Sequence, residues 1–108
     1  MNTVHHLTRP NSPPYRVRLG AWLPQLVGHD CITLHRTIYA RHTRISAHLH
    51  AHEHRHIQQW ASLGVLRFVV QYLTQQLLHG YAHNRFEVDA HQYALAHEAQ
   101  YEAVIGEA

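Results

Sequence analysis

The sequence predicts an α+β domain in which a small antiparallel sheet of two to three strands packs on three helices. Short β-prone runs come first in the chain, and longer runs with a helical period and capping residues follow them. With 108 residues, the chain is long enough for one modest core. We expect residues 15–108 to form this single domain and residues 1–14 to form an extended N-terminal arm with little structure of its own.

Composition excludes several classes of protein. Apolar residues make up 45% of the chain and charged residues 15%, which fits a soluble globular protein. The net charge of +2 is too small to favour nucleic acid, although fourteen histidines would make the chain cationic below about pH 6.5. The single cysteine, Cys31, excludes an intramolecular disulfide, and no run reaches the roughly 20 apolar residues of a membrane span. Without a signal peptide, these features indicate a cytoplasmic protein that binds neither nucleic acid nor membrane.

Three short segments have the pattern of strands. Residues 15–19 alternate apolar and basic side chains, which is the period of a half-buried strand. Residues 31–34 and 37–40 are both β-prone and are separated by two residues, so a hairpin is the simplest interpretation. The N-terminal arm holds three of the four prolines of the chain, which is typical of an extended segment.

Two helices follow directly after one another. Ser46 is a suitable N-cap for a helix that reaches about Leu63, and Gly64 ends it. Residues 65–79 form the second helix, which Gly80 ends. We expect the apolar stripe of this second helix to lie in the core. The stripe consists of Leu66, Val69, Val70, Leu73 and Leu77.

A third helix is predicted from a capping pattern. Asn84 and Glu87, three residues apart, resemble a capping box for a helix that reaches about Val104. In that arrangement Glu87 would only cap its own helix. The short tail at residues 106–108 could then fold back over a cleft.

The first helix contains the run His52-Glu53-His54-Arg55-His56. On a helix, the first and last of these histidines project from one face and can bind a single metal ion. This is the HExxH pattern of zinc-dependent peptidases. Zinc held by two imidazoles and a carboxylate keeps one tetrahedral position for a water, whose pKa falls to about 7. Glu53 can take the proton of that water as the water attacks a carbonyl carbon.

The abundance of histidine leaves a second interpretation open. Histidine occupies every even position from 48 to 56, so an HxxxH spacing also arises by chance. Such a run is typical of a His-rich metal-binding tract, or of a non-catalytic module in which zinc only stabilises the fold. We expect His48 to line the cleft beside the motif, and His50 and His54 to be solvated.

Three segments together resemble a known family. Residues 51–59 (AHEHRHIQQ), 80–81 (GY) and 84–90 (NRFEVDA) are similar to the compact gluzincins, in particular the single-domain minigluzincins. The likeness covers roughly residues 31–95. It implies a zincin-like fold and hydrolysis of a peptide bond in a peptide or protein substrate.

The resemblance also implies roles for individual residues. One zinc ion would be held by His52, His56 and Glu87. Glu53 would act as general base, and Tyr81 or His83 would donate to the developing oxyanion. An outer strand, which we expect at residues 37–41, would hold the extended substrate by backbone pairing.

One position departs from the family pattern. Four residues after the ligand Glu, the family commonly has an Asp that orients a zinc-bound His, and here that position is His91. Supporting groups of this kind contribute about 10 to 100-fold to affinity or activity. Asp89 lies on a different helical face and does not simply replace the missing group. We expect this departure to affect catalytic efficiency more than zinc binding.

Overall fold

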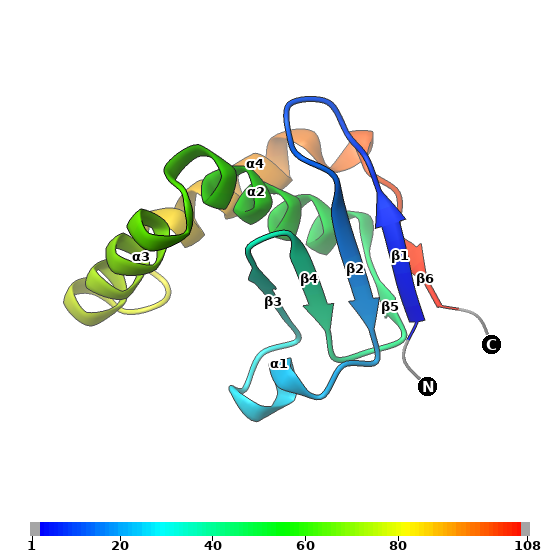
Figure 1. Ribbon diagram of the computed structural model, residues 1–108, viewed down its shortest axis with the longest axis horizontal. Coiled ribbons are helices and arrows are strands. Elements are labelled where there is room, and N and C mark those ends of the chain that lie inside the picture. Colours follow the sequence, from blue (N-terminus) through cyan, green and yellow to red (C-terminus); the bar gives the residue numbers. More distant parts are fainter. Residues whose placement is uncertain (1–2, 107–108) are drawn as a thin grey trace.

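The computed structural model describes residues 3–106 and has the predicted α+β architecture. The elements are β1 (Thr3–Leu7), β2 (Tyr15–Leu19), α1 (Leu23–Leu26), β3 (Cys31–Leu34), β4 (Thr37–Ala40), β5 (Arg44–Ile45), α2 (Ala47–Leu63), α3 (Val65–His79), α4 (Arg85–His97), a 3-10 helix (Glu98–Gln100) and β6 (Val104–Ile105). The main sheet packs against α2, α4 packs on α2, and α3 projects away from this body (Figure 1).

The main sheet is larger than predicted and mixed in direction. Its strand order is β1-β2-β4-β3, with antiparallel pairs at both edges and a parallel pair, β2 and β4, in the middle. The predicted hairpin of β3 and β4 is confirmed. Next to the motif helix the edge strand is β3, however, and not residues 37–41, because β4 is paired on both of its sides. β5 and β6 form a separate two-stranded sheet.

Part of the predicted N-terminal arm is a strand. Residues 3–7 form β1, which pairs along the whole of β2, with Thr3 opposite Leu19 and Leu7 opposite Tyr15. The prolines mislead here because all three lie in the connection between β1 and β2, where no ladder hydrogen bond requires an N–H. The prediction of an arm with little structure of its own is therefore wrong for residues 3–7, and residues 1–2 lie outside the part of the chain that the structure describes.

The α2 helix begins and ends as its sequence predicts. The Ser46 Oγ accepts a hydrogen bond from the Leu49 N–H at 3.1 Å, and Gly64 follows the helix with a φ of 82°. Such a φ strongly favours glycine, so this residue permits the abrupt change of direction into α3. Ile57 faces the core of the sheet, and Ala51 packs in a second apolar cluster with α4. Both flanks of α2 are therefore buried.

The α4 helix is shorter than predicted. It ends at His97, a 3-10 turn follows, and Val104 lies in β6 opposite Ile45. The chain leaves the helix because Tyr101 packs into the cluster beside α2 and brings the following residues to β5. In the predicted tail, the Gly106 N–H donates to the Thr43 carbonyl at 2.8 Å, and residues 107–108 lie outside the described residues.

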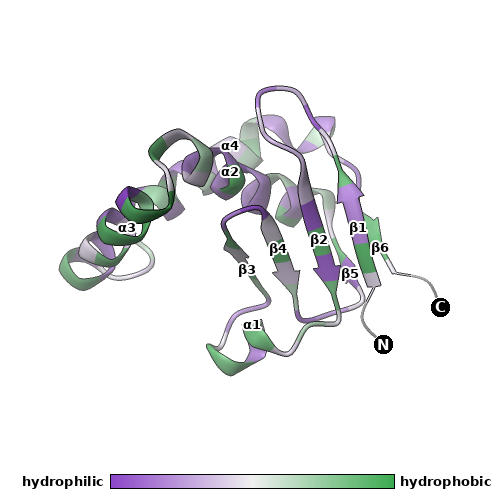
Figure 2. Ribbon diagram, viewed as in Figure 1, coloured by the Kyte–Doolittle hydropathy of each residue, from purple (hydrophilic) through white to green (hydrophobic). Residues whose placement is uncertain are grey.

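The α3 helix has the predicted bounds but not the predicted burial. Its buried residue is Phe68, which packs with Trp60 and Phe86. Figure 2 shows hydrophobic stretches along this projecting helix. The predicted core stripe is exposed, with Leu66 77% and Leu77 87% accessible, because no element of residues 3–106 covers this side. No helix in this range is both long and apolar enough to cross a membrane.

Candidate metal centre

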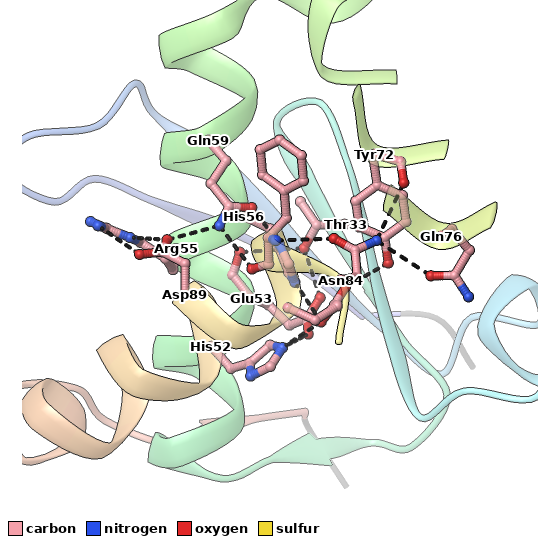
Figure 3. Close-up of polar contacts among 12 residues, drawn as sticks. Thr33, His52, Glu53, Arg55, His56, Gln59, Tyr72, Gln76, Asn84 and Asp89 are labelled. Atoms are coloured by element: carbon pink, nitrogen blue, oxygen red, sulfur yellow. Dashed lines mark hydrogen bonds and ion pairs between the residues drawn. The ribbon is translucent and has the colours of Figure 1, made fainter. Parts of the chain in front are cut away.

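Three side chains from two helices converge on one point. His52 and His56 project from the same face of α2 (Figure 3), and Glu87 lies in the first turn of α4. Glu87 Oε1 lies 3.1 Å from His52 Nε2 and 3.2 Å from His56 Nε2. One ligand atom from each residue lies within 4.8 Å of the other two, so this group could hold a metal ion. All three predicted ligands are thus brought together.

The position of Glu87 follows from the way α4 begins. Asn84 is the N-cap, and its Oδ1 accepts from the Phe86 N–H at 3.0 Å. The buried Asn84 amide also donates to the Tyr72 carbonyl at 3.3 Å, which ties the start of α4 to α3. The Glu87 carboxylate bonds to the two histidines and to Tyr72. Its role is therefore not the capping of its own helix, although its spacing from Asn84 is that of a capping box.

The two oxygens of the Glu87 carboxylate have separate partners. Oε1 faces the histidines, whereas Oε2 accepts a hydrogen bond from the Tyr72 hydroxyl at 2.6 Å. Burial raises the pKa of Glu87, yet hydrogen bonds from His52 and His56 outweigh it and hold that pKa well below its usual range. Burial and the bond to Glu87 raise the pKa of Tyr72, so its hydroxyl remains a donor. Glu87 is thus ionised, with one oxygen directed at the metal position.

A residue that the sequence interpretation missed orients His56. Gln59, one turn further along α2, accepts at Oε1 from His56 Nδ1 at 2.7 Å, which leaves Nε2 facing Glu87. Burial lowers the pKa of His56, but the hydrogen bond to Glu87 and the nearby charges of Glu53 and Glu87 outweigh it and raise the pKa to about 9. A cation bound at Nε2 would take the place of the proton there.

Gln59, and not residue 91, makes the orienting contact with a histidine of this group. The Gln59 amide donates to Asp89 Oδ2 at 2.9 Å, and Asp89 is bonded in turn to Arg55 Nε at 2.8 Å. Asp89 thus supports His56 through Gln59, although its helical face prevents direct contact. His91 lies elsewhere, with its ring 6.1 Å from that of His48. The spacing of three residues between His56 and Gln59 was the signal available in the sequence.

Glu53 lies beside the three residues that could hold a metal ion. It is 4% exposed, and its Oε2 is 3.8 Å from His52 Nε2. Oε1 accepts a hydrogen bond from the Thr33 hydroxyl of β3 at 2.9 Å. Glu53, His56 and Glu87 share the wall of a pocket of about 580 Å³ that lies between β3 and α3. The predicted general base is therefore placed both at the metal position and at a cavity.

The two predicted oxyanion donors have different positions. Tyr81 lines the pocket together with Glu53, and its ring packs 5.0 Å from that of His29. Burial and the charges of Glu87 and Glu53 raise the pKa of Tyr81, so its phenol keeps its proton. His83 is exposed in the turn before α4 and does not line this pocket. The structure therefore brings Tyr81, but not His83, to the site.

The other histidines of α2 lie away from this centre. His50 and His54 are 0% and 1% exposed, so the prediction that they are solvated is wrong. His50 bonds to the Tyr15 hydroxyl at 2.7 Å, and His54 bonds to the Tyr101 hydroxyl at 2.5 Å. His48 contacts Glu98 at 2.6 Å and does not line the pocket beside the motif, contrary to prediction.

Comparison with known proteins assigns this chain to no family. Comparison with protein-family models, with curated proteins and with solved structures finds no match in any of the three. The resemblance to minigluzincins is therefore carried by the motif residues alone.

Proposed function

We propose that this chain is a zinc-dependent peptidase. Two imidazoles and one carboxylate, converging within 4.8 Å, are the donor set of catalytic zinc sites that keep a position open for water or substrate. The bond from Tyr72 to Glu87 Oε2 favours ligation through a single carboxylate oxygen. A zinc ion held there would act as a Lewis acid on a substrate carbonyl and would acidify a water.

The observation that carries the proposal is the place of Glu53. A metal that only stabilised the fold would need no additional carboxylate, yet Glu53 lies 3.8 Å from His52 Nε2 and lines an open pocket. In the proposed reaction, Glu53 accepts a proton from the attacking water and then passes it to the leaving amine. Tyr81, from the same pocket wall, donates to the oxygen that gains charge.

The edge strand β3 supports a peptide as the substrate. Within residues 3–106 it pairs with β4 alone, so its other edge offers backbone N–H and C=O groups to an extended chain. Thr33 on this strand bonds directly to Glu53, and the strand forms one wall of the pocket. A peptide added at β3 would therefore lie across the metal position.

Substitution of Glu53→Gln tests the proposal. The wild type should bind one zinc per chain and cleave members of a broad peptide panel, and Glu53→Gln should keep the zinc and lose cleavage by at least about 100-fold. Glu98→Gln is the matched control, because Glu98 contacts His48 away from the centre. Cleavage that survived Glu53→Gln would refute the assigned role. One tightly held zinc with no cleavage of any peptide by the wild type would leave only the non-catalytic zinc module.

A further inference from the structure

The pocket beside the metal centre has two apolar walls. On one side is the edge strand β3, and on the other is α3, with aromatic residues of α2 and α3 at the junction. Its large apolar lining residues include Ile32, Leu34, Trp60, Phe68, Val69 and Leu73. Leu34 and Leu73 are 44% and 55% exposed, so part of this apolar surface faces the open pocket.

The charges around the pocket disfavour an acidic occupant. Glu53 and Glu87 are the carboxylates in its wall, and both belong to the centre already described. No arginine or lysine is among the residues that line it, and His56 is already paired with Glu87, so an acidic side chain would meet two carboxylates and no arginine or lysine partner. An apolar group, by contrast, gains free energy from covering Val69 and Leu73.

The α3 wall is held in a fixed position relative to the metal centre. The Tyr72 hydroxyl bonds to Glu87 Oε2 at 2.6 Å, and Asn84 donates to the Tyr72 carbonyl at 3.3 Å. Phe68 stacks on Trp60 with ring centroids 4.3 Å apart. The polar and aromatic contacts of α3 are thus directed at the centre, and its neighbouring residues Val69 and Leu73 form the pocket wall.

We infer that this pocket selects a large apolar side chain, such as Phe or Leu, next to the bond that is cut. The inference rests on the proposed function for its chemistry, but the apolar lining of the pocket consists of residues outside the metal-binding set. A volume of about 580 Å³ lies within the range of pockets that enclose small ligands. Leu73 then becomes a specificity-determining residue, since it faces the pocket and makes no polar contact with the centre.

A peptide series tests the inference by activity. The peptides are identical except at one position, which carries Phe, Leu, Gly, Asp or Lys, and kcat/KM is measured with zinc-loaded protein. We expect Phe and Leu to exceed Gly and Asp by about 10 to 100-fold. Leu73→Glu should remove this preference and raise the rate for Lys above that for Phe. Leu77→Glu is the matched control, because Leu77 is 87% exposed on the same helix and does not line the pocket.

Binding separates this inference from the proposed function. Calorimetry with the zinc-loaded Glu53→Gln protein measures the affinity for each peptide without cleavage. If the Phe peptide binds more tightly than the others and Leu73→Glu abolishes this difference, the selectivity of the pocket is supported even if the wild type cleaves nothing. Equal affinities for all five peptides, or cleavage with a preference that Leu73→Glu leaves unchanged, would overturn the inference while leaving hydrolysis intact. Circular dichroism confirms that each variant is folded.

Discussion

Helices α2 and α3 are neighbours of similar length, 17 and 15 residues, but they place polar and apolar side chains in opposite ways. On α2, polar residues are buried. These are His50, Glu53, His54, His56 and Gln59. On α3, the leucines and valines are exposed and Phe68 is buried. Burial on α2 therefore serves hydrogen bonding and holds side chains that could bind a metal ion, whereas α3 contributes an apolar wall.

The difference has an energetic basis. A buried polar group costs free energy unless it has a partner. Each of the five buried polar residues on α2 has such a partner. In His50, for example, Nδ1 donates to the Glu102 carbonyl at 2.8 Å, and Nε2 then accepts from the Tyr15 hydroxyl. The α3 helix makes fewer contacts with the rest of the protein than α2 does. Its attachment depends on the aromatic contact at Phe68 and the polar bonds of Tyr72.

The largest effect should come from removing the aromatic contact that holds α3. Phe68→Ala should lower the free energy of unfolding by about 3–5 kcal/mol, because it leaves a cavity between Trp60 and Phe86. Leu66→Ala, on the same helix but 77% exposed, should change it by no more than about 0.5 kcal/mol. Urea denaturation of both variants measures the difference. Equal losses would show that the exposed stripe of α3 is covered in solution.

The next effect concerns the polar support on α2. Gln59→Leu removes the acceptor of His56 Nδ1 and should weaken zinc affinity by about 10 to 100-fold. Competition with a chromogenic chelator measures this affinity. Gln92→Leu, an exposed substitution on α4, is the control and should leave zinc binding unchanged. If Gln59→Leu bound zinc as tightly as the wild type, Gln59 would not be the group that orients His56.

The comparison of α2 with α3 shows which structural features can be predicted from this sequence. The ends of α2 were predictable because Ser46 and Gly64 act within one turn of the chain. The two histidines and Glu53 were predictable because their spacing on one helix is fixed. The exposure of α3 was not predictable. An apolar stripe shows only that one side of a helix is apolar, and whether another element covers that side depends on the whole fold.

Contacts between segments that are far apart in the sequence could not be predicted from local patterns, for the same reason. The pairing of β1 with β2 depends on strands joined across a proline-rich connection. Gln59 and Tyr72 acquire their roles only when α2, α3 and α4 meet at one point. The family resemblance placed Glu87 beside His52 and His56, and the structure brings it there, whereas its spacing from Asn84 alone favoured the other role, a cap.

A pH-dependent effect follows from the buried histidines of α2. Burial lowers the pKa of His54 to about 4, with nearby His50 and Arg9 adding to the shift. The ring is therefore neutral in the folded protein while an unfolded chain binds its proton near pH 6.5. As the pH falls from about 6.5 towards 4, the free energy of unfolding should decrease by at most about 1.4 kcal/mol per pH unit from this group. Below about pH 4 the contribution should level off.

Nuclear magnetic resonance checks this directly by following the His54 ring signals through an acid titration. The imidazole should stay neutral until about pH 4. Denaturation is measured in parallel with a chelator present at every pH, so that loss of metal does not contribute to the slope. A ring that titrated near pH 6.5 would contradict the buried contacts with Tyr101 and Ser12.

The smallest effect concerns the hydrogen bond that joins Thr33 of β3 to Glu53 of α2. Thr33 donates to Glu53 Oε1 at 2.9 Å and thereby fixes the carboxylate relative to β3, where the substrate would pair. Thr33→Val keeps the shape of the side chain but removes the donor, so kcat should fall by about 3 to 10-fold with little change in KM. Thr33→Ser restores the hydroxyl and should restore kcat. A rise in KM alone, unaffected by Ser, would assign Thr33 to packing of the substrate strand and leave Glu53 positioned by α2 without help from the sheet.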